Sequence, residues 1–130
     1  MATKEEHRAK WQHNRRFLAT IQAPQYSDWM ATVAFYAAVH CVEVLLAKDG
    51  ISHPMTHEGR NECLKRQNRY KKIWENYRPL YEASIVARYL SFQSQKHPSF
   101  DQWITPEQVR TQLIDTYLRQ IEASVSKLLA

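Results

Sequence analysis

Glycine is the scarcest chain-breaking residue in this 130-residue sequence, which contains only Gly50 and Gly59. Without a glycine-rich segment the chain has no phosphate-binding loop and no dinucleotide-binding fingerprint, so those nucleotide-dependent enzyme classes are excluded. Proline contributes only five further breaking residues. Such a low content favours long helices, because a protein of many short strands would need a turn about every ten residues.

Cysteine is equally scarce, and Cys41 and Cys63 form neither a disulfide framework nor a C-x-x-C pair. Two cysteines without a disulfide framework favour a protein of the reducing cytoplasm. The charged N-terminus lacks the apolar region of a signal peptide. His53 and His57 have a spacing that could bind a metal on a helix, but Pro54 opposes a helix through His53. We therefore predict no metal and no other cofactor.

Acidic residues are the minority, with 13 Asp and Glu against 18 Lys and Arg, for a formal net charge of +5. This surplus suits an anionic partner such as RNA or a nucleotide. The alternative is that the charge serves solubility alone. The length suits one domain, here residues 1–130, with enough chain to bury a core.

The spacing of apolar residues predicts an all-α fold, an antiparallel bundle of four to five helices. The helices are expected over 4–22, 28–48, 57–67, 70–90 and 105–128, with a connection over 90–104. Ser27 and Thr56 are predicted N-caps, and capping boxes are predicted for Thr3 with Glu6 and for Thr105 with Gln108.

Two features of these helices carry more specific predictions. Pro79 predicts either a break near residues 76–78 or a kink, because proline removes a donor and clashes with the preceding turn. In the last helix, the predicted apolar face consists of Val109, Leu113, Tyr117, Ile121, Val125 and Leu128.

The segment 28–48 is apolar on nearly all sides, which predicts one central buried helix. Its length also fits a bilayer. We favour a soluble core helix and no membrane, because the segment contains Thr32, His40 and Glu43 and the other helices need a partner for their apolar faces.

A polar stripe on this helix is the most informative feature, because Thr32, Tyr36, His40 and Glu43 share one face. A buried carboxylate and imidazole need partners, and the candidates are His57, Arg60 and Arg88. One interpretation is a buried ion pair, Glu43 with Arg60 or Arg88. The other is a small catalytic site of His40, Glu43, His53, His57 and Arg60, with imidazoles as acid and base and arginine on a phosphate.

Ligand-binding and nucleic-acid-binding candidates extend this site. The ligand-binding candidates are Tyr36, Arg60, Tyr81 and Arg88. A basic run with an interleaved aromatic residue could follow a phosphate backbone, or it could be an ordinary solvated surface. Its cations are Lys65, Arg66, Arg69, Lys71 and Lys72.

Three segments in this order resemble the HEPN domains of prokaryotic defence, toxin–antitoxin and nucleotidyltransferase-partner systems. They are the Tyr-Ala-Ala-x-His-x-x-Glu step at 36–43, the Thr-His-x-Gly-Arg step at 56–60 and the Ala-Arg-Tyr step at 87–89. The resemblance covers residues 10–128. It implies a bundle of four or five helices, a homodimer, and a link to RNA or nucleotides.

Active ribonucleases of that group carry an arginine followed by a histidine, with four to six residues between them, typically near the start of a late helix. Here only Arg8 and His13 match, and they lie in the first helix. We therefore expect a binding module that contacts RNA, a nucleotide or a partner protein. The alternatives are a metal-independent ribonuclease using His57 or His53 with Arg60, and a structural partner subunit of a nucleotidyltransferase. An open cleft would favour the ribonuclease, and an exposed apolar patch near Phe100 or Trp103 would favour the subunit.

Overall fold

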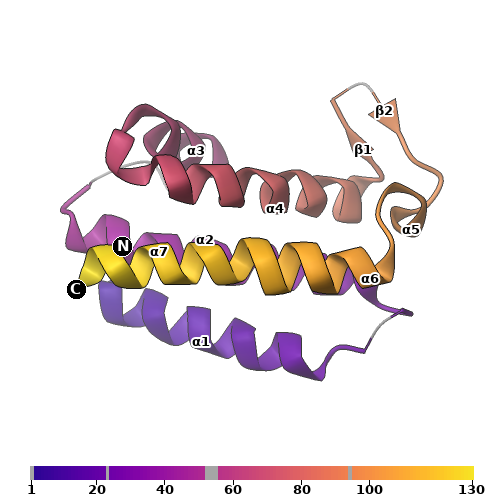
Figure 1. The fold of residues 1–130 in the computed structure, drawn as a ribbon, viewed down its shortest axis with the longest axis horizontal. Helices are drawn as coiled ribbons and strands as arrows, with labels where there is room; N and C mark the ends of the chain where they lie inside the picture. Colours follow the sequence, from indigo (N-terminus) through magenta and orange to yellow (C-terminus); the bar gives the residue numbers. More distant parts are fainter. Residues whose placement is uncertain (1, 23, 52–55, 94) are drawn as a thin grey trace.

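The computed structural model describes residues 2–22, 24–51, 56–93 and 95–130. Over these residues the chain is mostly helical, which confirms the predicted all-α bundle (Figure 1). The elements in chain order are α1 (Lys4–Thr20), α2 (Ser27–Lys48), α3 (His57–Arg66), η1 (Asn68–Tyr70), α4 (Lys71–Tyr89), β1 (Ser91–Phe92), β2 (Gln95–Lys96), α5 (Phe100–Trp103), α6 (Pro106–Gln108), η2 (Val109–Leu118) and α7 (Arg119–Leu129).

The long helices lie roughly side by side (Figure 1). In that view α1 forms one layer, α2 and the continuous segment α6–η2–α7 overlap in the middle, and α3 and α4 form the opposite layer. α2 packs against α1, α4, η2 and α7, so it is the central buried helix that the sequence predicted.

Burial of α2 bears directly on the membrane alternative. Among the described helices it alone is long and apolar enough to cross a bilayer, but 78% of its most apolar window is buried inside the protein. Its side chains Phe35, Cys41 and Leu45 are completely buried. The other helices therefore occupy the positions that lipid would fill, as expected for the core helix of a soluble protein.

Most helix ends lie where their capping residues predicted. Thr3 and Glu6 form a reciprocal capping box, as do Thr105 and Gln108, and the Thr56 hydroxyl accepts from the backbone of the third residue of α3. Each cap satisfies donors that the first turn of a helix leaves free.

The predicted N-cap at Ser27 is wrong. Tyr26 occupies the cap position, Ser27 is the first residue of α2, and its hydroxyl donates to Asp101 Oδ1 at 2.5 Å. The serine therefore ties α5 to α2 rather than capping its own helix. At the other end Gly50 has a φ of +71°, and two backbone hydrogen bonds from Gly50 and Ile51 to the last turn complete a glycine C-terminal motif.

Pro79 does not break its helix, because α4 runs continuously from Lys71 to Tyr89. The missing donor and the steric clash typically cost about 3 kcal/mol. Burial offsets this cost, since Ile73, Tyr77, Leu80 and Ser84 line the inward side of the helix both before and after the proline. Of the two alternatives that the sequence left open, the break is therefore wrong.

The last helix follows the predicted span, and the predicted face packs on the core. η2 is π-helical, and each turn of a π-helix takes up more residues than an α-helical turn. Val109, Leu113, Ile121 and Val125 are buried as predicted, but Leu118 is buried where the α-helical period predicted Tyr117. Tyr117 and Leu128 are partly buried against the core, so the π-helical turns add Ile114 and Leu118 to the inward face rather than replacing it.

The connection over 90–104 contains more structure than predicted. Strands β1 and β2 pair antiparallel, and α5 follows with Ser99 as its N-cap. Phe100 is buried, and Trp103 is partly buried against the core. These two residues therefore do not form the exposed apolar patch that would have favoured a partner subunit.

Candidate functional site

The polar stripe of α2 has partners on three different elements. Tyr36 contacts α4, His40 contacts α1, and Glu43 contacts α3. Thr32 is the exception, because its hydroxyl donates to the carbonyl of Asp28 in its own helix at 2.9 Å. The shared face predicted from the four- and three-residue spacing therefore contributes to the packing of three elements around α2.

Glu43 and Arg60 form the predicted buried ion pair. Arg60 Nε donates to Glu43 Oε1 at 2.6 Å, and the two residues are only 4% and 3% exposed. Burial disfavours the arginine charge, but Tyr77 and the Glu43 carboxylate outweigh this effect and raise the pKa of Arg60. The pair fixes α3 on α2, because removing one partner would leave a buried charge uncompensated.

A second histidine that the sequence did not assign to the site completes this network. His7 of α1 is 4% exposed, its Nδ1 lies 3.0 Å from His40 Nδ1, and its Nε2 lies 4.0 Å from Glu43 Oε2. The spacing of His7, Asn14 and Leu18 is consistent with one inward face of α1, and all three are buried. The sequence does not show that the packing of α1 on α2 brings His7 opposite His40.

The chemistry of the histidine pair favours the neutral state of His40. Two facing Nδ1 atoms need one N–H donor and one free acceptor. Burial, followed by the charges of His7, Lys10 and Arg60, lowers the pKa of His40 to about 4, and the opposing effect of Glu43 is smaller. His40 is therefore neutral near pH 7 and lacks the imidazolium proton that a general acid would donate.

His57 lies on the same side of the network and is partly exposed. Its Nδ1 is 3.3 Å from Arg60 Nη1, and its ring packs near Phe35, Tyr36 and Tyr81. Burial and then the positive charges of Arg60 and Arg88 lower its pKa, so it too is neutral near pH 7. Because Arg60 is only a donor, His57 Nδ1 acts as the acceptor and Nε2 carries the proton.

Arg88 is held by its own helix and by α2. Its three nitrogen atoms donate to the Ser84 carbonyl, the Ser84 hydroxyl and the Tyr36 hydroxyl at 3.1, 3.4 and 3.1 Å, and the guanidinium lies over the rings of Tyr36 and Tyr89. Of the two arginines considered as partners for Glu43, Arg60 thus forms the close ion pair. The ligand-binding candidates Tyr36 and Arg88 do come together.

These positions bear on the predicted catalytic set. Glu43, Arg60 and the added His7 are buried, and only His40 and His57 are partly exposed. His53 lies outside the described residues. The described part of the chain contains no group of three or more His, Cys, Asp or Glu that could bind a metal. The ribonuclease pattern does not converge either, since Arg8 and His13 are both exposed and their spacing directs them to different sides of α1.

A separate polar cleft lies between α3, α4 and the β1–β2 hairpin. It has a volume of about 290 Å³. Its lining residues are Asn61 and Lys65 on α3, Trp74, Arg78, Tyr81 and Glu82 on α4, and Phe92 and Gln93 at the hairpin. The Lys65 ammonium lies over the Trp74 ring, 5.2 Å from its centre. We call this hollow the Asn61 cleft.

Asn61 is unusual within this cleft. It is 9% exposed, and its Oδ1 atom has no hydrogen-bond partner among the described residues. Buried amide oxygens are nearly always paired, and an unpaired one costs about 1–3 kcal/mol. No sequence signal could have identified it, because the isolated Asn61 looks like any polar residue of a short peripheral helix.

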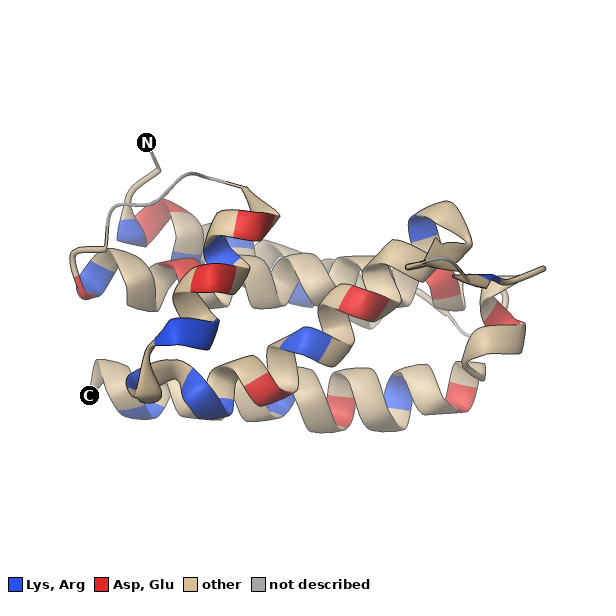
Figure 2. Cartoon of the chain, turned by 90° about the horizontal axis from the view of Figure 1, so that it is seen from above, with Lys and Arg blue, Asp and Glu red and all other residues tan. Residues whose placement is uncertain are grey.

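The predicted nucleic-acid residues are all exposed and follow one another through the end of α3, η1 and the start of α4 (Figure 2). Lys65 and Arg66 form exposed ion pairs with Glu62. Arg69 donates to Asp49 through two nitrogen atoms at 2.9 and 3.2 Å. We call the run from Lys65 to Lys72 the basic turn, and its first residue also lines the Asn61 cleft.

The fold and these contacts define a small all-α helical bundle with a buried ion-pair network and a polar cleft beside a basic turn. No model of a protein family, no curated protein and no solved structure matches the chain. The resemblance to HEPN domains therefore stays a prediction, and function has to be inferred from the geometry of the described residues.

Proposed function

We propose that this protein is a HEPN-like binding module that contacts single-stranded RNA through the Asn61 cleft and the basic turn. The observation that carries the proposal is the Asn61 cleft itself, where a nearly buried amide with an unpaired oxygen lies among aromatic side chains and next to Lys65. Amides and aromatic rings are the groups with which proteins bind unpaired bases.

The dimensions and lining of the cleft suit one nucleotide unit. Its volume of about 290 Å³ lies near the lower end of the range for small-ligand pockets. Trp74, Tyr81 and Phe92 line it, and stacking on aromatic rings contributes about 1–3 kcal/mol per base. Rotation of the Asn61 amide would let a base edge supply the hydrogen bond that its oxygen lacks.

The basic turn would hold the backbone on either side of that nucleotide. Lys71 and Lys72 are exposed, and the ion pairs of Lys65 and Arg66 with Glu62 are exposed too. Exposed pairs contribute little to stability, so a phosphate can replace the carboxylate at small cost. For single-stranded RNA, each phosphate neutralised adds about 0.7 to the slope of log affinity against log salt.

Binding is favoured over cleavage by the state of the imidazoles. A metal-independent ribonuclease needs one histidine that can give a proton and another that can accept one. Lowered pKa values leave both His40 and His57 neutral near pH 7, and Arg60 is buried against Glu43. We assign Arg60 to the positioning of α3, and we expect the module to act in the cytoplasm, where RNA is available.

The test is fluorescence anisotropy of a labelled single-stranded RNA of about ten nucleotides, long enough for one cleft and the basic turn. Trp74→Leu should weaken binding about tenfold or more, whereas Trp29→Leu on α2 should not. Lys71→Gln with Lys72→Gln should lower the salt slope, and Arg110→Gln with Arg119→Gln removes the same charge from the last helix as a control.

Two results would contradict the proposal. One is equal weakening by the two double variants, since binding would then follow net charge rather than the basic turn. The other is RNA cleavage in the presence of EDTA that is lost in His57→Ala, which would establish the metal-independent ribonuclease instead. Circular dichroism of every variant would separate lost binding from lost folding.

A further inference from the structure

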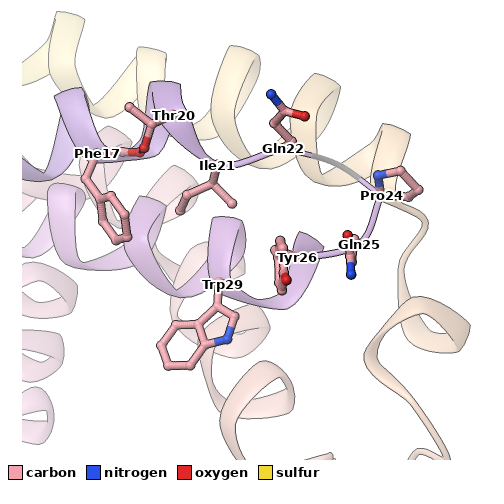
Figure 3. A pocket seen from close by; sticks show the side chains of 8 residues that line it. All are labelled: Phe17, Thr20, Ile21, Gln22, Pro24, Gln25, Tyr26 and Trp29. Atoms are coloured by element: carbon pink, nitrogen blue, oxygen red, sulfur yellow. The ribbon is translucent and has the colours of Figure 1, made fainter.

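Three large aromatic side chains that the core does not use line one cavity between the end of α1 and the start of α2 (Figure 3). Phe17, Tyr26 and Trp29 are 51%, 48% and 58% exposed. The cavity has a volume of about 680 Å³, and Ile21 forms part of its wall. Exposed aromatic groups around a hollow are typical of interaction sites rather than of ordinary surface.

The position of the cavity strengthens this interpretation. Tyr89 and Leu90 are the other two large exposed hydrophobic residues of the described chain. All five lie toward the same end of the bundle, where α1 ends, α2 begins and α4 ends (Figure 1). Of the five, only Phe17, Tyr26 and Trp29 line the cavity, so the apolar surface that a partner would cover is centred there.

The lining of the cavity identifies the kind of surface that would cover it. Its eight lining residues include no charged side chain, and the polar ones are Thr20, Gln22 and Gln25. A phosphate would find no cation within the hollow, so the lining does not favour RNA. Apolar side chains of a protein would remove the rings from water and leave the amides of Gln22 and Gln25 at the rim.

The neighbouring surface of α1 adds a charge preference. Residues 7–27 contain four cations, Arg8, Lys10, Arg15 and Arg16, and no carboxylate. Arg15 pairs with Glu122, whereas Arg8, Lys10 and Arg16 are exposed. Lys10 and Arg16 line a second hollow on α1 together with Glu6, so two cations and one carboxylate lie there, and Arg16 directly precedes Phe17 of the apolar cavity. A partner seated in the cavity would therefore extend along a positively charged helix.

We propose that this cavity and the α1 surface beside it bind an acidic amphipathic helix of a partner protein. Such a helix would insert apolar residues spaced three and four apart between Phe17, Tyr26 and Trp29, and its carboxylates would face Lys10 and Arg16. A second copy of this chain fits less well, because the positive α1 surfaces would repel each other. The proposal does not depend on RNA binding at the Asn61 cleft.

Synthetic helical peptides of about 15 residues provide the probe. The first carries leucine and phenylalanine at positions i, i+3, i+4 and i+7, with glutamate at the exposed positions. A second replaces each glutamate with lysine, and a third replaces each apolar anchor with alanine. We expect the acidic peptide to bind at least about tenfold more tightly than either control, measured by calorimetry.

Protein variants locate the binding. Trp29 is the most exposed of the three rings, so its fluorescence should shift to shorter wavelength as the acidic peptide covers it. Trp29→Ala should weaken the acidic peptide about tenfold or more, because exposed aromatic anchors dominate such interfaces. Tyr89→Ala is the matched control, since Tyr89 is 64% exposed but does not line the cavity. Arg16→Glu should reduce the preference for the acidic peptide.

Four results would overturn the proposal. The first is no binding of the acidic peptide at about 1 mM, the weak limit of specific recognition. The second is equal affinity for the acidic and basic peptides. The third is self-association of the protein that Trp29→Ala abolishes, which would assign the cavity to a second copy. The fourth is RNA binding that Trp29→Ala abolishes and Trp74→Leu leaves unchanged.

Discussion

Replacing Asn61 with leucine should make the protein more stable and a weaker binder of RNA. Asn61 is only 9% exposed, and its Oδ1 atom has no hydrogen-bond partner among the described residues. Removing an unpaired buried acceptor recovers a desolvation cost of about 1–3 kcal/mol. Leucine has the same number and branching of heavy side-chain atoms and a better helix propensity, and the adjoining cleft leaves room for its larger methyl groups, so we expect a net gain of about 1–2 kcal/mol in the free energy of unfolding.

Urea denaturation followed by circular dichroism would measure this gain, and anisotropy with the labelled RNA would measure binding on the same samples. Asn76→Leu on α4 is the control. Its amide donates to the Lys72 carbonyl at 2.9 Å, so the same substitution gains helix propensity but removes a satisfied group. The reasoning would be refuted by an Asn61→Leu protein that is less stable than Asn76→Leu, or by one that binds RNA as tightly as the wild type.

Three further predictions concern the network and the last helix. Arg60→Ala should lower the free energy of unfolding by about 3–5 kcal/mol, because it leaves the buried Glu43 charge without its close partner; replacing both residues with leucine should cost much less, and urea denaturation would show the difference. The pKa of His40 is lowered from 6.5 to about 4 in the folded protein, so the unfolded chain binds the proton first as the pH falls. The contribution of neutral His40 to stability is therefore complete above pH 6.5 and is lost as the pH falls toward 4. In His40→Gln the free energy of unfolding should decrease less over this pH range, which denaturation at a series of pH values would measure. Leu118→Ala should destabilise the protein by about 2–5 kcal/mol and more than Tyr117→Ala, whereas the reverse order in thermal melts would show that the last helix is α-helical throughout.

The helices were predictable because their signals are local. The capping boxes at Thr3 and Thr105 each involve residues within a few positions of each other, and both were confirmed. The Ser27 N-cap and the helix break near Pro79 were wrong because tertiary contacts outweighed the local preference of these residues. Ser27 bonds to Asp101, 74 residues away, and the burial on both sides of Pro79 keeps α4 continuous.

The candidate site was predictable only in part for the same reason. The spacing of Tyr36, His40 and Glu43 on one helix showed that a polar face existed and needed partners. It could not show which helix would supply each partner, so the contribution of His7 and the choice of Arg60 for the close pair appeared only with the tertiary structure. The unpaired oxygen of Asn61 was beyond sequence reasoning, because it is defined by contacts that are missing rather than by residue type.

The buried ion-pair network and the Asn61 cleft share α3, which supplies Arg60 to the network and Asn61 to the cleft. Arg60, which the Glu43 pair fixes in place, directly precedes Asn61 on α3. Arg60→Ala would therefore disturb the cleft by loosening α3, and a loss of RNA binding in that variant would resemble the loss of a ligand-binding residue. Stability separates the two roles. A positioning residue loses binding and stability together, whereas Asn61→Leu should lose binding while stability rises. Opposite signs of the stability change in these neighbouring variants would place Arg60 in the scaffold and Asn61 in the binding surface.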